Sequence, residues 1–202
     1  MIEQLLERAG EGDPSAMGPL MERYRQRLCQ MVAFHLDPRL SARLDASDVV
    51  QETLAEAAEQ IREYVQQRPL PFYAWLRQIA WRRLVHQHVR HLWTAKRSVH
   101  REQEADLLLS DASALELARQ LQGPTTGPST AMIHQEQTKR LRVALQQLRM
   151  RDREVLVLRY IEQLSAQEIA AIMGITAAAV NMRHMRALER LRELMEHGSE
   201  ES

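Results

Sequence analysis

Residues 176–196 form a helix-forming stretch in which asparagine, arginine, alanine and methionine side chains share one face. At helical spacing, Val180 and Leu191 lie on one side of this stretch and a mixed set lies on the other. Asparagine can pair bidentately with adenine and arginine with guanine, alanine or methionine can touch a thymine methyl group, and a flanking arginine can hold phosphate. The residues predicted to contact DNA are Thr176, Ala178, Asn181, Met182, Arg183, Met185 and Arg186.

A glycine separates this stretch from a shorter helix-forming run, residues 165–173. Ser165 and Glu168 have the spacing of a capping box, which predicts the start of the short helix. Gly174 supplies the left-handed conformation that ends it, and Thr176 is placed to cap the next helix. Helices joined this tightly cross steeply, which predicts a helix-turn-helix whose second helix fits the major groove of DNA. A helical hairpin in a protein–protein module is the alternative that this pattern leaves open.

Charge is sorted along the chain, although the formal net charge is zero. Residues 64–101 hold eight basic residues and no acidic one, and aromatic residues lie between them. Residues 1–63 hold seven basic and twelve acidic residues, and residues 102–202 hold twelve basic and fifteen acidic. A basic segment with aromatic residues predicts a polyanion partner. The alternative is that this basic helix pairs with the acidic segment before it.

Composition favours a helical protein and excludes several function classes. The chain has 202 residues, of which 45% are hydrophobic, 27% charged and 4% aromatic. One cysteine, Cys29, cannot form an internal disulfide, and no apolar run is long enough for a membrane span or signal peptide, so we expect a cytoplasmic protein. We find no phosphate loop and no nucleophile with a base, and therefore expect neither an enzyme nor a cofactor. His86 and His88 face different directions on a helix, so we expect no metal site.

The helical pattern falls into two groups along the chain. Helices are predicted over residues 2–9, 15–36, 47–65 and 72 to about 93, and again over 132–149, 151–162, 165–173 and 176–196. Ser47, with Asp48 beside it, is the predicted N-cap of the third helix. The intervening segment is acidic and contains two Gly-Pro pairs and one short helix, 109–121. We predict an all-α protein of two small helical domains, residues 1–98 and 134–202, joined by a flexible acidic linker over residues 99–133.

Both halves resemble the same protein family. The run at residues 145–193 resembles the fourth conserved domain of bacterial RNA polymerase sigma factors, especially the extracytoplasmic-function (ECF) class. Residues 47–57 resemble the helix by which sigma domain two grips the polymerase clamp. Residues 72–90 resemble the next helix, which opens and reads the minus-ten element. The order and separation of these regions also match, and the absence of a domain three between them fits the ECF class.

The resemblance implies a sigma factor that binds core RNA polymerase and directs promoter recognition and transcription initiation. Asp48, Gln51 and Glu52 lie where domain two contacts a basic coiled coil of the polymerase, and Asp48, Glu52 and Glu56 form an acidic stripe at helical spacing. Melting a duplex requires groups that capture flipped bases and cations that hold the backbone. The residues that would supply these groups at the minus-ten element are Trp81, Arg82, Arg83, Arg90, Lys96 and Arg97. The predicted DNA-contacting residues of the helix-turn-helix would contact the minus-35 element.

The expected partners are therefore core RNA polymerase and promoter DNA. Because ECF factors are often restrained by an anti-sigma factor, the resemblance raises such a protein as a further partner. The alternative function is a free-standing helix-turn-helix transcriptional regulator, which would bind DNA alone through residues 150–196 and dimerise through its first domain. A sigma relative that has become a protein-interaction scaffold is a second alternative, against which Asn181, Arg183 and Arg186 argue.

Overall fold

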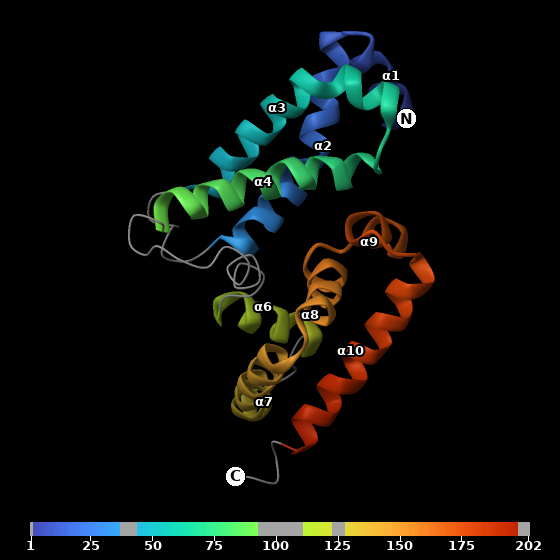
Figure 1. Ribbon diagram of the computed structural model, residues 1–202. Helices are drawn as coiled ribbons and strands as arrows, with labels where there is room; N and C mark the ends of the chain where they lie inside the picture. Colours follow the sequence, from blue (N-terminus) through green and yellow to red (C-terminus); the bar gives the residue numbers. More distant parts are fainter. Residues whose placement is uncertain (1, 37–43, 93–110, 123–127, 198–202) are drawn as a thin grey trace. The chain divides into compact units, whose positions relative to one another are not determined.

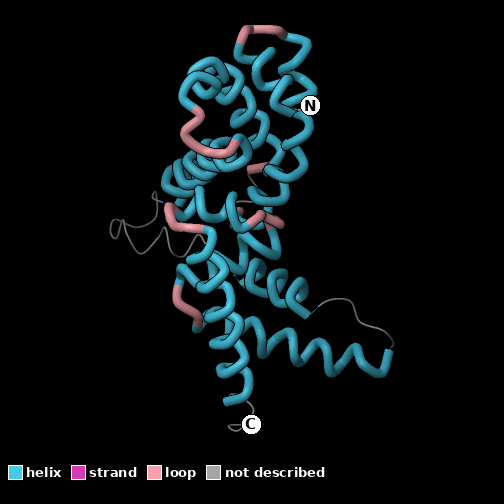
Figure 2. The backbone as a smooth tube through the Cα atoms, turned by 90° about the vertical axis from the view of Figure 1, so that its right-hand side faces the viewer, coloured by secondary structure: helices cyan, strands magenta, loops and turns pink. Residues whose placement is uncertain are grey.

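The computed structural model describes residues 2–36, 44–92, 111–122 and 128–197. All secondary-structure elements in these ranges are helices, which confirms the predicted all-α fold (Figure 1). The chain divides into two compact units, Met1–Ser98 and Val99–Ser202. Where the connections between helices are described, they are short loops (Figure 2).

The described residues of the first unit form four helices packed around one core. They are α1 (Ile2–Gly10), α2 (Pro14–His35), α3 (Ala46–Gln67) and α4 (Phe72–Leu92). α2 and α3 each pack against all three of the other helices. The largest fully buried side chains of this core are Leu20, Leu28, Met31, Leu76, Ile79 and Leu84. Each such side chain stabilises the fold by about 1.5–3 kcal/mol, so apolar burial is what holds these helices together.

Aromatic rings fix the turn between α3 and α4. The Tyr64 ring stacks on Trp75 with 4.5 Å between centroids, and it lies 5.2 Å from the Phe72 ring. The Tyr64 hydroxyl donates a hydrogen bond to the carbonyl oxygen of Leu70 at 2.9 Å. Arg68 ends α3 in the left-handed conformation with a φ of 42°. Both ends of the turn are therefore anchored, and α4 begins at a fixed place on α3.

The N-cap of α3 differs from the prediction. The cap is Asp45, whose carboxylate accepts a hydrogen bond from the Ser47 backbone amide at 2.9 Å. Ser47 itself lies in the first turn of the helix, so its prediction as the cap was wrong. Aspartate and serine cap helices about equally well, and the apolar pattern begins only at Val49, so the sequence offered no way to choose between them.

The described residues of the second unit form six helical elements. They are α6 (Asp111–Gln122), α7 (Pro128–Gln147), α8 (Met150–Leu156), η1 (Val157–Ile161), α9 (Ala166–Met173) and α10 (Ala177–His197). α10 packs against α7, α8 and α9, whereas α6 packs against α7 and η1. η1 is a π-helical turn, in which the Glu162 amide bonds to the Val157 carbonyl oxygen at 3.1 Å. The continuous helix predicted over 151–162 therefore contains one widened turn.

Part of the predicted linker belongs to the core of the second unit. The buried side chains of α6 are Ala114, Leu117 and Ala118. Because α6 packs against α7 and η1, this stretch is not a solvated connection. α7 also begins at Pro128, four residues before the predicted start. Residues 99–110 and 123–127 lie outside the described residues, and the flexibility of the linker there stays a prediction.

Replacing Leu117 by alanine tests the packing of α6. The Leu117 side chain is fully buried, so the substitution should destabilise the second unit by about 2–5 kcal/mol through lost burial and the cavity left behind. Hydrogen exchange measured by mass spectrometry should show faster exchange in α6 and α7. Gln120→Ala is the matched control, because Gln120 is exposed on the same helix. Equal protection in the two variants would contradict the packed arrangement.

Candidate promoter and polymerase interfaces

The predicted capping groups of the helix-turn-helix are all confirmed. Ser165 Oγ accepts a hydrogen bond from the Glu168 amide at 3.2 Å, and the Glu168 carboxylate accepts one from the Ser165 amide at 2.8 Å. Gly174 ends α9 with a φ of 65°. Thr176 Oγ1 then accepts a hydrogen bond from the Ala179 amide at 3.1 Å, which caps α10. The two helices are thus separated by one tight turn.

Gly174 is needed for its backbone conformation and not for space. A β-carbon added at this position would meet no atom within 4 Å. A φ of 65° is nevertheless a conformation that residues with a side chain adopt at a cost. The turn therefore depends on glycine because of its positive φ, as the sequence predicted.

The opposite faces of α10 have opposite environments. Val180, Ala187 and Leu191 are buried, and they fasten α10 to the rest of the unit. The predicted contact residues with exposed side chains are Ala178, Asn181, Met182, Met185 and Arg186 on the other side of the helix, and Thr176 at its N-cap. Met182 and Met185 are 55% and 56% exposed, which is uncommon for large apolar side chains and typical of a contact surface.

Arg183 differs from the other predicted contact residues. Its guanidinium is half-buried and lies 3.4 Å from the Asp152 carboxylate of α8. The pair links α10 to α8 and neutralises part of the arginine's charge. The phosphate contact of Arg183 stays a prediction. It would require the guanidinium to bind a DNA phosphate and the Asp152 carboxylate at the same time.

A further contact holds α10 against η1, and sequence reasoning missed it. Tyr160 Oη and His184 Nε2 lie 3.2 Å apart. Burial lowers the pKa of His184, and the nearby Arg159 lowers that pKa further. A histidine with a lowered pKa is neutral at neutral pH, and its stabilising contribution is lost as the pH falls through that pKa. The sequence gives no signal for this contact, because the two residues meet only through the crossing of two elements.

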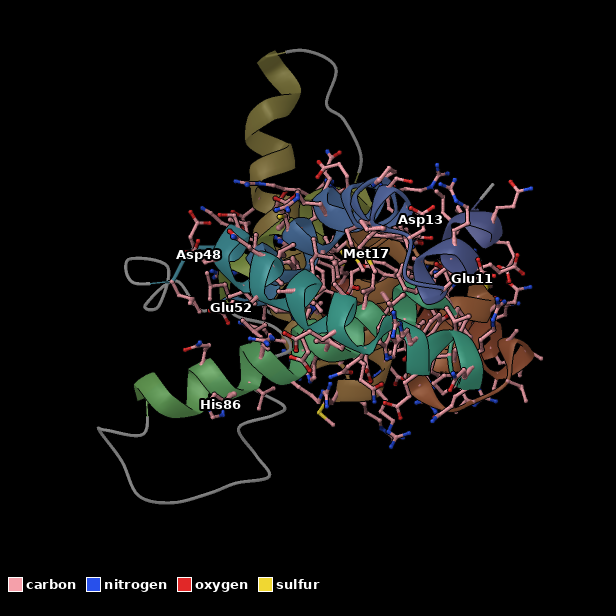
Figure 3. All side chains as sticks on the ribbon, turned by 90° about the horizontal axis from the view of Figure 1, so that it is seen from above. Glu11, Asp13, Met17, Asp48, Glu52 and His86 are labelled. Atoms are coloured by element: carbon pink, nitrogen blue, oxygen red, sulfur yellow. The ribbon has the colours of Figure 1, made fainter. Side chains whose placement is uncertain are left out.

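In the first unit, the predicted polymerase-binding residues lie on an exposed part of α3. Asp48, Gln51 and Glu52 are all exposed. Figure 3 shows Asp48 and Glu52 toward the same end of α3, with His86 on the neighbouring helix α4. Asp48 makes no ion pair within the described part of the chain, whereas the carboxylate of Glu52 lies 2.7 Å from a nitrogen of Arg83. The structure thus brings one predicted polymerase contact together with one predicted DNA contact.

The basic helix does pair, in part, with the acidic segment before it. Arg83 contacts both Glu52 and Glu56 at 2.7 Å, and Arg82 contacts Glu56 at 3.2 Å. The alternative interpretation of the basic segment is therefore observed for these two arginines. The side chains of Arg90, Lys96 and Arg97 lie outside the described residues.

The Trp81 ring packs against side chains of its own unit, so it is less accessible than a fully exposed ring that bases could stack on. Its ring meets the His35 ring edge-on with 5.0 Å between centroids, and the Arg77 guanidinium carbon lies 5.5 Å from the ring centre. The side chain is half-buried, so part of the ring still reaches solvent. Its predicted contact with a flipped base stays a prediction.

Known proteins match both units of the chain. Residues 20–95 match the family Sigma-70 region 2, and residues 138–191 match Sigma-70, region 4, which together make more than half of the chain. ECF RNA polymerase sigma factor SigD of Mycobacterium tuberculosis is 27% identical over 95% of this chain and 82% of that protein. The ECF RNA polymerase sigma-E factor of Haemophilus influenzae is 28% identical over 93% and 91%. The chain belongs to the sigma-70 family, in the ECF class.

A third relative of this sigma factor has a solved structure. RNA polymerase sigma factor CnrH of Cupriavidus metallidurans is 29% identical over 97% of this chain and 95% of that protein. The structure of CnrH in complex with the cytosolic domain of CnrY aligns with a TM-score of 0.53 and 23% identity, over 96% of this chain and 97% of that chain. This likeness supports the shared fold.

Family membership assigns the two units. The first contains region 2 and the second, with its helix-turn-helix, contains region 4. This sigma factor binds core RNA polymerase and directs promoter recognition. The free-standing regulator has no support, because its dimerisation domain would occupy the half of the chain that matches region 2. Within the described residues, no helix has both the length and the apolar character required to cross a membrane.

Proposed function

We propose that the two units of this sigma factor read the two elements of a bipartite promoter while α3 holds core RNA polymerase. The observation that carries the proposal is the division of α10 into two faces. Its buried residues fasten the helix, and its exposed face presents amide, guanidinium and thioether groups to solvent. These groups match the hydrogen-bonding and methyl groups of the major groove.

On α10, the proposed minus-35 contacts divide by chemistry. Asn181 and Arg186 supply hydrogen bonds to base edges, and Met182 and Met185 supply apolar contact with thymine methyl groups. Residues 134–197 contain 11 basic and 8 acidic residues, so the electrostatic attraction to DNA is modest. Weak attraction suits a subunit that binds promoters as part of a larger enzyme, since affinity for free DNA grows with the number of phosphates neutralised.

In the first unit, α4 supplies the proposed minus-ten contacts and α3 supplies the polymerase contacts. Asp48, Gln51 and Glu52 present two carboxylates and one amide, which fit a cationic partner helix. Trp81 and the arginines of α4 supply the stacking and phosphate-binding groups that a melted strand requires. Catalysis stays with the polymerase, and we place the protein in the cytoplasm with that enzyme.

A restraining protein partner is also part of the proposal. CnrH, which has the same fold, is described in complex with the cytosolic domain of CnrY. By analogy, a protein that binds this sigma factor would compete with polymerase or DNA for the same exposed residues. The exposed apolar pair Met182 and Met185 is available to such a partner.

Run-off transcription tests the function directly. Bacterial core RNA polymerase is assayed with and without this chain on a library of promoter fragments. Transcripts that appear only with the chain, and that start at a fixed distance from a shared bipartite sequence, are the expected result. Sequence-specific DNA binding without core polymerase, and no new transcripts, would instead support a free-standing regulator.

Replacing Arg186 by alanine tests the proposed minus-35 surface. A bidentate contact with guanine contributes about 1–3 kcal/mol, so transcription from cognate promoters should fall by about tenfold or more. Binding to core polymerase, measured by pull-down, should stay unchanged. Arg192→Ala is the matched control, because Arg192 is exposed on the same helix but lies six residues after Arg186, about 9 Å farther along the helix axis. An equal loss in both assays would show misfolding and would contradict the assignment.

Charge reversal at Asp48 tests the proposed polymerase surface. Asp48→Lys places a cation against the cationic partner helix, so affinity for core polymerase should fall by about tenfold or more. Asp48 is a sharper probe than Glu52, because Glu52 also contacts Arg83. Glu11→Lys, which reverses an exposed charge in the turn after α1, is the control. Unchanged affinity of the Asp48 variant in a titration with core polymerase would reject this surface.

A further inference from the structure

Glu56 lies between two arginines of α4. One of its carboxylate oxygens lies 3.2 Å from Arg82 Nη2, and the other accepts hydrogen bonds from Arg83 Nε at 2.8 Å and lies 2.7 Å from Arg83 Nη2. The Glu56 side chain is 21% exposed, against 62% for Arg82. Glu56 is therefore the most enclosed member of the group.

Glu52 closes the group from the preceding turn of α3. Arg83 Nη1 donates to a carboxylate oxygen of Glu52 at 2.7 Å. All three guanidinium nitrogens of Arg83 thus face carboxylates, in the forked geometry that arginine also uses to bind phosphate. Two arginines and two glutamates carry no net charge together. We call these four residues, Glu52, Glu56, Arg82 and Arg83, the α3–α4 charge network.

The charge network is not what holds α3 to α4. The two helices share a buried apolar contact in which Leu54, Ala57, Ala80 and Leu84 are at most 5% exposed. Ion pairs near the surface add about 0–1 kcal/mol each, which is small beside that burial. The network therefore acts mainly on the charge and the orientation of the two arginines.

A DNA phosphate and a glutamate carboxylate compete for the same guanidinium group. We propose that Glu56 is a positioning residue that holds Arg82 and Arg83 along α3 and neutralises them, so that this part of the free chain attracts a DNA backbone only weakly. The proposal rests on the proposed minus-ten role of the two arginines. It makes Glu56 a residue that acts on DNA binding through its neighbours, without touching DNA.

Glu56→Gln is the decisive substitution. Glutamine keeps the size of the side chain and its hydrogen-bonding capacity, but it leaves the network with one net positive charge. One additional phosphate contact steepens the dependence of log K on log salt concentration by about 0.7 for a single strand, and it corresponds to about a fivefold gain in affinity at 0.1 M salt. The measurement is fluorescence anisotropy of a labelled thymidine 20-mer with the full chain, from 50 to 200 mM KCl.

Glu59→Gln is the matched control. Glu59 is exposed on the same face of α3 and makes no ion pair with α4 in the described part of the chain. Its substitution removes the same charge but releases no arginine, so affinity should change by less than about twofold, with little change of the salt dependence. In a chain that also carries Arg82→Gln and Arg83→Gln, Glu56→Gln should give no gain. Circular dichroism melting confirms that each variant is folded.

Three results would overturn the inference. They are an unchanged affinity in the Glu56→Gln variant, a gain equal to that of Glu59→Gln, and a gain that persists without the two arginines. Any of them would mean that Glu56 does not control the charge of Arg82 and Arg83 toward DNA. Run-off transcription by the wild-type chain reports on the proposed function separately, because the anisotropy comparison needs no polymerase.

Discussion

The second unit depends on the burial of one face of α10. A helix of 21 residues that places Val180, Ala187 and Leu191 in the core must turn its opposite face to solvent. The left-handed turn at Gly174 sets where α10 begins, and Thr176 caps it there. Everything proposed for the minus-35 surface follows from this geometry, because no residue on the exposed face could be presented without the anchor on the buried one.

In the first unit, the pairing of opposite charges decides which side chains of α3 and α4 are exposed to a partner. The sequence separates acidic residues before position 64 from basic residues after it, and α3 and α4 bring the two together side by side. Opposite charges therefore cancel within the α3–α4 charge network, as they do over the whole chain. Along this one acidic stripe, Asp48 is exposed whereas Glu52 pairs with Arg83 of α4.

The fold was largely predictable because its signals are local. Capping boxes, the glycine turn and helical periodicity act within a few residues, and the helix-turn-helix was predicted from them. The choice of Asp45 over Ser47 as a cap was not predictable, since both types cap well. The widened turn at Val157–Ile161 leaves the apolar pattern almost unchanged, and so the sequence showed only a continuous helix.

Contacts between elements account for what the sequence did not reveal. The pairing of Glu56 with Arg82 and Arg83, and of Tyr160 with His184, depends on where two helices cross. Sorted charge suggested that acidic and basic segments could meet, but not which residues would do so. The buried residues of α6 were likewise hidden, because Gly-Pro pairs beside them are typical of a linker.

Glu52 belongs both to the proposed polymerase surface and to the α3–α4 charge network, and this limits how the first unit can evolve. A substitution at Glu52 that suits another polymerase also removes a partner from Arg83, and a substitution at Arg83 leaves Glu52 without its cation. Residues in contact tend to change together, so positions 52, 56, 82 and 83 should covary among relatives of this chain. For the same reason, α3 grafted alone from another sigma factor would leave Arg82 and Arg83 of α4 without matched carboxylates.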